Sequence, residues 1–283
     1  MTLNEIELKT NRLGLATLDY ENLLNEIIIC KKECAAAGNE IDSKRLWIIQ
    51  QMFEIHKDYN LAFKLLKEKK YYDAWCKLEN IEIDFHYLKK HFSFDKSQYK
   101  LYFIEKSVRN LQVLFPYRIF SSMEILEKEK KCSICGKILK FRSPCEHKIG
   151  EIYGGELCIR EISDFELLGI ALVENPVNKY TVPFTTNPET NERVDHYDYG
   201  IIDYLMSIVK NTYEPWDLIV YNKLLPHSSF NQTKEEDPCP CGSGENYQEC
   251  CLKQAGVKSV HFRFIVKQLP KNTNMKKKKK RKK

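Results

Sequence analysis

The chain has 283 residues, enough for one large domain or two ordinary ones, and 43% of them are hydrophobic, which allows a sizeable core. The mean hydropathy is −0.48, and no apolar run approaches the ~20 residues of a membrane-spanning helix. The formal net charge of +6 is concentrated at one end, because Lys276–Lys283 are all basic and the remainder carries a net charge of −2, so the body lacks the positive charge that would indicate nucleic-acid binding.

Residues 1–116 are predicted to form a helical domain. The first apolar stripe at helical spacing ends near Gly38, a residue that favours a helix C-terminus. Its members are Tyr20, Leu23, Leu24, Ile27 and Ile28. Asp42 or Ser43 can cap the helix that follows.

Two further helices are expected at 58–69 and 71–91. A narrow apolar seam, suited to packing against another helix, then ends at Pro116. Its members are Leu101, Ile104, Val108, Leu111 and Phe115. These segments make up the helical half of the predicted fold.

Residues 117–226 are expected to form a mixed domain. The short apolar runs LCIREI and LLGIALV suit strands better than helices. Helical spacing returns at 201–209, and a second helix is expected to begin at Pro215, a favourable first-turn position, and to end at Pro226.

The remaining chain divides by composition into three parts. Residues 227–236 are polar and read as a linker, residues 237–269 hold a cysteine-rich module and a short strand, and residues 270–283 form a disordered basic tail. The predicted fold class is therefore α+β, with a helical N-terminal half, a small β-containing domain and a C-terminal module.

The eleven cysteines indicate metal binding rather than disulfides. The first residues lack a basic start followed by an apolar stretch, so we expect no signal peptide and a cytoplasmic protein, in which thiols stay reduced. Eight of the cysteines fall in two groups: Cys132, Cys135, Cys145 and Cys158, then Cys239, Cys241, Cys250 and Cys251. The other three are expected to be small buried hydrophobic residues: Cys30, Cys34 and Cys76.

The strongest signal is the pattern C-x-C-x8-C-C, formed by Cys239, Cys241, Cys250 and Cys251. Zinc takes four ligands in a tetrahedron, and a C-x-C turn can aim two sulfurs at one point. The adjacent cysteine pair can supply the other two sulfurs from the end of a short helical turn. Glycines between the ligands allow the backbone to wrap tightly, so this segment predicts one structural zinc ion.

The segment DPCPCGSGENYQECC resembles the SEC-C motif, which is known from the C-terminus of the preprotein-translocase motor ATPase and from otherwise unrelated proteins. All four ligand positions, the Gly-Ser-Gly turn and Tyr247 match, while Glu245 and Glu249 stand where the family usually has lysines. The resemblance implies zinc binding and the docking of a protein partner or the ribosome. It does not imply a translocase, because the sequence has no phosphate-binding loop. The alternative is a module that only staples the C-terminus.

The second cluster contains a zinc-knuckle pattern. Cys132 and Cys135 have C-x2-C spacing before a glycine, and Cys145 and His147 form a C-x-H pair. Three sulfurs and one imidazole complete a Cys3His tetrahedron around a second zinc ion. Cys158 can take the place of His147, but the surrounding residues predict a strand there, so we rank it behind the histidine.

An HNH-type nuclease is an alternative interpretation of this cluster, since such enzymes often place C-x2-C before a histidine-containing metal centre. The acidic, asparagine and second histidine positions of that motif are not convincingly placed here. A histidine that binds zinc through its lone pair cannot also act as a general base. We therefore prefer a structural knuckle, and we assign no catalytic residue and no cofactor site apart from the zinc ligands.

The basic tail Lys276–Lys283 can contact phosphate groups of RNA or DNA, the ribosome or an acidic membrane, or it can simply increase solubility. Phosphate contacts of this kind are insensitive to sequence and weaken with salt. The sequence as a whole predicts a zinc-binding adaptor rather than an enzyme. A metal-dependent nuclease and a nucleic-acid-binding protein are the alternatives.

Overall fold

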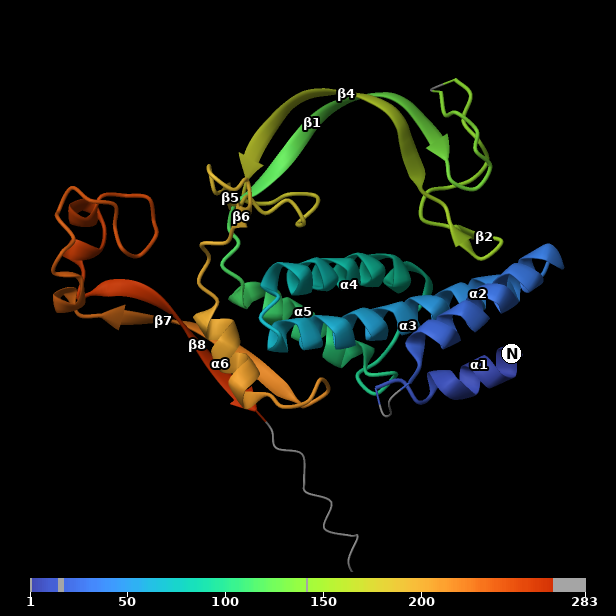
Figure 1. Ribbon diagram of the computed structural model, residues 1–283, viewed down its shortest axis with the longest axis horizontal. Coiled ribbons are helices and arrows are strands. Elements are labelled where there is room, and N and C mark those ends of the chain that lie inside the picture. The colour runs from blue at the N-terminus through green and yellow to red at the C-terminus, as the bar shows by residue number, and fades with distance from the viewer. Residues whose placement is uncertain (1, 15–17, 141, 267–283) are drawn as a thin grey trace, which may run out of the picture. The chain divides into compact units, whose positions relative to one another are not determined.

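The computed structural model describes residues 2–14, 18–140 and 142–266, and the chain divides into two units, Met1–Tyr213 and Glu214–Lys283. The fold is α+β as predicted, with helices in the N-terminal half and small antiparallel sheets after them (Figure 1). Within the described residues, no helix is both long enough and apolar enough to span a bilayer. The basic tail expected at 270–283 lies outside the described residues.

Packed helices begin the first unit. They are α1 (Leu3–Thr10), α2 (Tyr20–Ala36), α3 (Glu40–Lys67), α4 (Tyr71–His91) and α5 (Leu101–Leu114). The apolar seam predicted along α5 is confirmed, because all five of its members are buried. The predicted bounds of α4 also agree with the structure.

The prediction of two separate helices between residues 42 and 69 is wrong, because α3 is continuous. The sequence of α3 contains neither glycine nor proline, and buried side chains recur along its whole length. They include Leu46, Phe53, Tyr59 and Leu66. The cap is Asn39 rather than Asp42 or Ser43: its side-chain oxygen accepts a hydrogen bond from the Asp42 amide at 3.2 Å.

A long two-stranded ribbon follows the helices (Figure 1). Strands β1 (Phe120–Cys132) and β4 (Arg160–Val173) pair antiparallel from Phe120↔Val173 to Cys132↔Arg160, with register shifts in the middle. The strand prediction for LLGIALV is confirmed, and LCIREI spans the end of β3 (Glu156–Leu157) and the start of β4. β3 pairs with β2 (Ile152–Tyr153) beside the ribbon.

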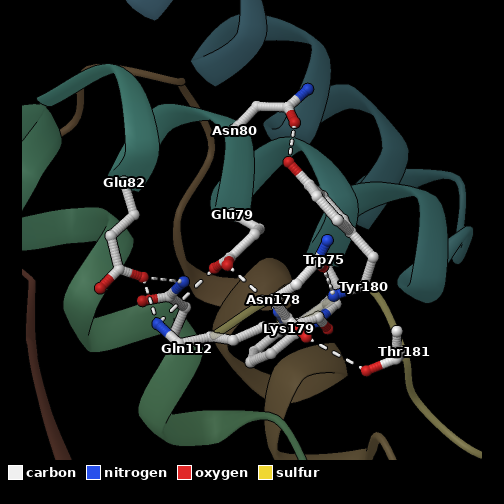
Figure 2. Close-up of polar contacts among 9 residues, drawn as sticks. All are labelled: Trp75, Glu79, Asn80, Glu82, Gln112, Asn178, Lys179, Tyr180 and Thr181. Carbon is white, nitrogen blue, oxygen red and sulfur yellow. Dashed lines mark hydrogen bonds and ion pairs between the residues drawn. The ribbon is translucent and has the colours of Figure 1, made fainter. Parts of the chain in front are cut away.

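Hydrogen bonds and ion pairs hold the segment that follows β4 against α4 (Figure 2). The Trp75 indole donates a hydrogen bond to the Lys179 carbonyl at 2.6 Å, and the Lys179 amide donates to Glu79 at 3.2 Å. The Lys179 ammonium lies between the carboxylates of Glu79 and Glu82, and the Tyr180 hydroxyl donates to Asn80. Phe120, at the start of β1, stacks near Trp75 with ring centroids 6.1 Å apart, so this end of the ribbon is held against the helices.

The first unit ends with a small hairpin and a helix. The hairpin consists of β5 (Thr185–Thr186) and β6 (Arg193–Val194), and α6 (Gly200–Ile208) confirms the helical spacing predicted at 201–209. The Lys67 ammonium donates to the carbonyl oxygens of Met206 and Val209, which ties the C-terminal end of α6 to α3.

The helix predicted to begin at Pro215 is wrong. Residues Trp216–Leu225 form the strand β7, which pairs antiparallel with β8 (Val257–Val266) from Trp216↔Val266 to Leu225↔Val257. The predicted strand near the C-terminal end is confirmed by β8. Because each strand supplies the other's backbone hydrogen-bond partners, the pairing with β8 overrides the first-turn preference of the proline.

Candidate metal centres

The C-terminal cluster lies between β7 and β8 in the second unit. The sulfurs of four cysteines all lie within 4.8 Å of one another: Cys239, Cys241, Cys250 and Cys251. The Cys241 and Cys250 sulfurs are 3.6 Å apart, and those of Cys250 and Cys251 are 3.9 Å apart. Zinc–sulfur bonds of ~2.3 Å in a tetrahedron give sulfur–sulfur distances of about 3.8 Å, so the four thiols are spaced as such a site requires.

Local backbone geometry brings the two halves of this cluster together. The Gly242 amide donates to the Cys239 carbonyl at 3.0 Å, which closes the C-x-C turn, and the Cys239 amide donates to the Glu245 backbone carbonyl at 2.8 Å. Gly242 and Gly244 have φ of +79° and +80°, values that glycine adopts without steric cost. Cys250 lies between the short helical turns η2 (Tyr247–Glu249) and η3 (Cys251–Lys253), and its sulfur and that of Cys251 lie within 4.8 Å of both C-x-C sulfurs.

A small apolar cluster and one histidine support these ligands. Cys239, Tyr247, Cys251 and Val257 are buried together, with Phe230 packed against them. His227, in the turn η1 (His227–Phe230), lies 3.0 Å from the Gln254 carbonyl through Nε2 and 2.6 Å from the Tyr247 hydroxyl through Nδ1. A carbonyl can only accept, so Nε2 carries the hydrogen and Nδ1 accepts from the tyrosine. Sequence reasoning placed this histidine in a linker and missed it, because its contacts are made only in the folded module.

Hydrogen bonds favour the thiolate form of Cys241 at this centre. The Ser243 hydroxyl and neighbouring thiols lower the pKa of Cys241 to about 6. Ser243 Oγ also lies 3.3 Å from the Cys250 sulfur. This hydroxyl lowers the pKa of Cys250, but burial and the neighbouring thiols outweigh it and raise that pKa to about 12. Thiolates are the form that binds metal, so Cys241 is the ligand whose pKa favours binding of a divalent cation.

The central cluster lies at the end of the β1–β4 ribbon. Donor atoms of Cys132, Cys135, Cys145 and His147 all lie within 4.8 Å of one another. The Gly136 amide donates to the Cys132 carbonyl at 2.8 Å, forming the knuckle turn that the C-x2-C-G pattern predicts. The backbone amide of Cys135 lowers the pKa of Cys132 to about 6. The His147 ring packs edge-on against Tyr153, and its Nδ1 is buried without a hydrogen-bond partner.

Cys158 belongs to this neighbourhood as well. Its side chain is buried, and its sulfur lies 3.9 Å from that of Cys132. It does not lie inside a strand, as the sequence suggested, but in the short segment between β3 and β4. A cavity of about 30 Å³ is lined by Cys132, Cys145, His147 and Cys158 together with neighbouring residues.

An ion pair and hydrogen bonds, which the sequence patterns do not predict, hold the region of the central cluster against the helices. The buried Lys31 of α2 pairs with Glu156 at 2.8 Å, and the Gly154 amide donates to Glu40 of α3 at 2.8 Å. His91, at the end of α4, lies 2.7 Å from the Gly150 carbonyl through Nε2. The second end of the ribbon is therefore held against three helices.

Both clusters have donor sets typical of structural zinc. Among the described residues, these are the groups of three or more cysteine, histidine, aspartate or glutamate side chains close enough to share a metal ion. Neither group contains a carboxylate, and sulfur with imidazole suits zinc better than magnesium or calcium. Each cluster could therefore hold a metal ion.

Comparison with known proteins identifies a known motif at one of the two clusters. The family model of the SEC-C motif matches residues 237–253. No curated protein and no solved structure matches the chain. Residues 237–253 therefore form a SEC-C motif, whose four cysteines converge as metal ligands would, and the rest of the chain is unassigned.

Proposed function

We propose that this protein is a zinc-binding adaptor whose SEC-C module docks a protein or ribosomal partner. The observation that carries the proposal is the convergence of four sulfurs, from two short segments of a recognised motif, at the spacing of a zinc tetrahedron. A zinc ion held by Cys239, Cys241, Cys250 and Cys251 gives the short loops of the module one fixed shape. A fixed loop surface binds with a smaller entropic cost than a mobile one.

The charge of the module favours a basic protein surface as its partner. The loop from Gly242 to Asn246 is exposed and carries the acidic side chain of Glu245. Residues 237–253, the SEC-C motif, contain three acidic side chains and one basic side chain. Such a surface repels the phosphates of a nucleic acid and attracts lysines and arginines, which basic proteins, those of the ribosome included, can supply.

The central cluster is proposed to hold a second zinc ion through Cys132, Cys135, Cys145 and His147. The buried and unpartnered Nδ1 of His147 supports this assignment, since buried polar atoms normally have a partner. The role proposed for this ion is structural, because it fixes the end of the ribbon against the helices. None of the eleven cysteines, all of them among the described residues, forms a disulfide, which agrees with a reducing compartment, and we propose the cytoplasm.

Two measurements test this function in the full-length chain. The first is zinc content of the reduced protein, with about two ions expected per chain and about one after Cys250→Ser with Cys251→Ser. Cys34→Ser, a change outside both clusters, is the matched control and should keep both ions.

The second measurement is co-sedimentation with purified ribosomes and binding to basic ribosomal proteins. The Cys250→Ser, Cys251→Ser chain should lose binding while its helical circular dichroism is retained. Undiminished binding by this chain would place the docking surface outside the SEC-C module.

A further inference from the structure

We propose that Cys158 is a fifth donor of the central metal centre and can complete its coordination in place of His147. The inference rests on the proposed second zinc ion. It concerns how that ion is held, which neither the SEC-C motif nor the C-x2-C and C-x-H patterns address.

The distance between sulfurs places Cys158 beside a ligand of the central cluster. Cys158 and Cys132 place their sulfurs 3.9 Å apart, against about 3.8 Å expected for two thiolates on one tetrahedral zinc ion. The SEC-C cluster of the same protein provides an internal comparison, with 3.6 Å and 3.9 Å between its sulfurs. Toward Cys132, Cys158 therefore has the spacing of two SEC-C ligands, while the donors that all lie within 4.8 Å of one another are those of Cys132, Cys135, Cys145 and His147.

Backbone hydrogen bonds fix the position of Cys158. Its amide donates to the Glu151 carbonyl at 2.8 Å, and its carbonyl accepts from the Gly150 amide at 2.8 Å. Gly150 is in turn held by His91 of α4. A thiol on an anchored backbone, 2% exposed and facing a metal-ligating cysteine, is held ready for coordination.

The central cluster offers more donors than one zinc ion needs. His147 has an unpartnered, buried Nδ1, so it too is placed as a ligand. Structural zinc takes four ligands, whereas Cys132, Cys135, Cys145, His147 and Cys158 offer five. Both the imidazole and the fifth thiol line the same small cavity, so either can occupy the fourth position. A site of this kind keeps its metal when one of these two donors is lost.

The test compares zinc content in full-length wild type, His147→Ala, Cys158→Ala and the double variant, each reduced and dialysed against a competing chelator. About two zinc ions per chain are expected in the wild type and in both single variants, and about one in the double variant. Cys30, a buried thiol on α2 away from the cluster, supplies the matched control: His147→Ala with Cys30→Ala should retain both ions. Helical circular dichroism reports whether each chain is folded.

A second readout identifies the ligands directly. In a chain whose SEC-C site is removed by Cys250→Ser and Cys251→Ser, X-ray absorption at the zinc edge should show four sulfur neighbours after His147→Ala. A folded His147→Ala chain that loses its central zinc, while the wild type keeps two, would overturn the role of Cys158 and leave the zinc-knuckle proposal standing. A wild type with a single zinc ion, bound by the SEC-C module, would overturn both.

Discussion

The buried side chain of His56 should make the stability of the protein depend on pH. Its side chain on α3 has no exposed surface; Nε2 lies 2.8 Å from the Tyr99 carbonyl and Nδ1 lies 2.7 Å from the Tyr213 hydroxyl. The carbonyl must accept, so Nε2 donates and the neutral ring accepts from the tyrosine at Nδ1. Burial, with a contribution from nearby Lys100, lowers the pKa of His56 to about 4.

The sign and size of the effect follow from proton linkage. Unfolded His56 takes up a proton near pH 6.5, whereas folded His56 does so only near pH 4. The folded state binds fewer protons in this window, so acidification destabilises it, by about 2 kcal/mol at pH 5 and about 3 kcal/mol at pH 4. A loss of this size is a large part of the ~5–15 kcal/mol that holds a typical domain together.

The assay is urea unfolding of the wild type and of His56→Gln between pH 7.5 and pH 4, followed by helical circular dichroism. Glutamine can donate to Tyr99 and accept from Tyr213 but does not titrate. Acid loss of metal and titration of other groups are common to both chains, so the difference in unfolding free energy isolates His56. The wild type should lose about 3 kcal/mol relative to the variant across this range. A difference independent of pH would refute the reasoning.

Three further predictions concern other parts of the chain. Burial, with the nearby Asp58 and Glu54 carboxylates, raises the pKa of Asp84 to about 7, so protonated Asp84 stabilises the fold below pH 4 and this contribution is lost as pH rises through 7. The substitution Asp84→Asn should therefore raise the unfolding free energy more at pH 8 than at pH 5, by about 2–4 kcal/mol, and equal effects at both pH values would contradict this. Gly155 has φ +74°, and an added Cβ would lie 2.6 Å from the Lys31 side chain, so Gly155→Ala should lower the unfolding free energy, measured by thermal unfolding, by about 1–3 kcal/mol. Gly38→Ala should cost less, because Gly38 has a similar φ of +71° but an added Cβ there would have no atom within 4 Å. Deleting Lys276–Lys283 should reduce the salt dependence of any RNA binding, lowering the slope of log K against log salt by up to about 5, and an unchanged slope would exclude the tail as the phosphate contact.

Local chemistry made several features predictable from sequence. The helical N-terminal half, the buried seam of α5 and the bounds of α4 follow from apolar spacing, which depends only on neighbouring residues. The C-x-C turn and the C-x2-C-G knuckle are equally local, because a few dihedral angles set the directions of their sulfurs. These patterns identified both clusters before any long-range contact was known.

The strand pairing and the additional side chains at the two clusters depend on contacts between residues far apart in the sequence. Trp216–Leu225 becomes a strand because β8, beyond the whole SEC-C module, supplies its hydrogen-bond partners. Cys158 joins the central cluster because the antiparallel pairing of β1 and β4 returns it to Cys132, and His227 supports Tyr247 through contacts across the module. The sequence by itself determined which side chains could bind a metal and which local turns hold them, since these depend on residues close along the chain. Only the tertiary structure decided which strands pair and which additional side chains meet at each cluster, since pairing brings together residues that no local spacing relates.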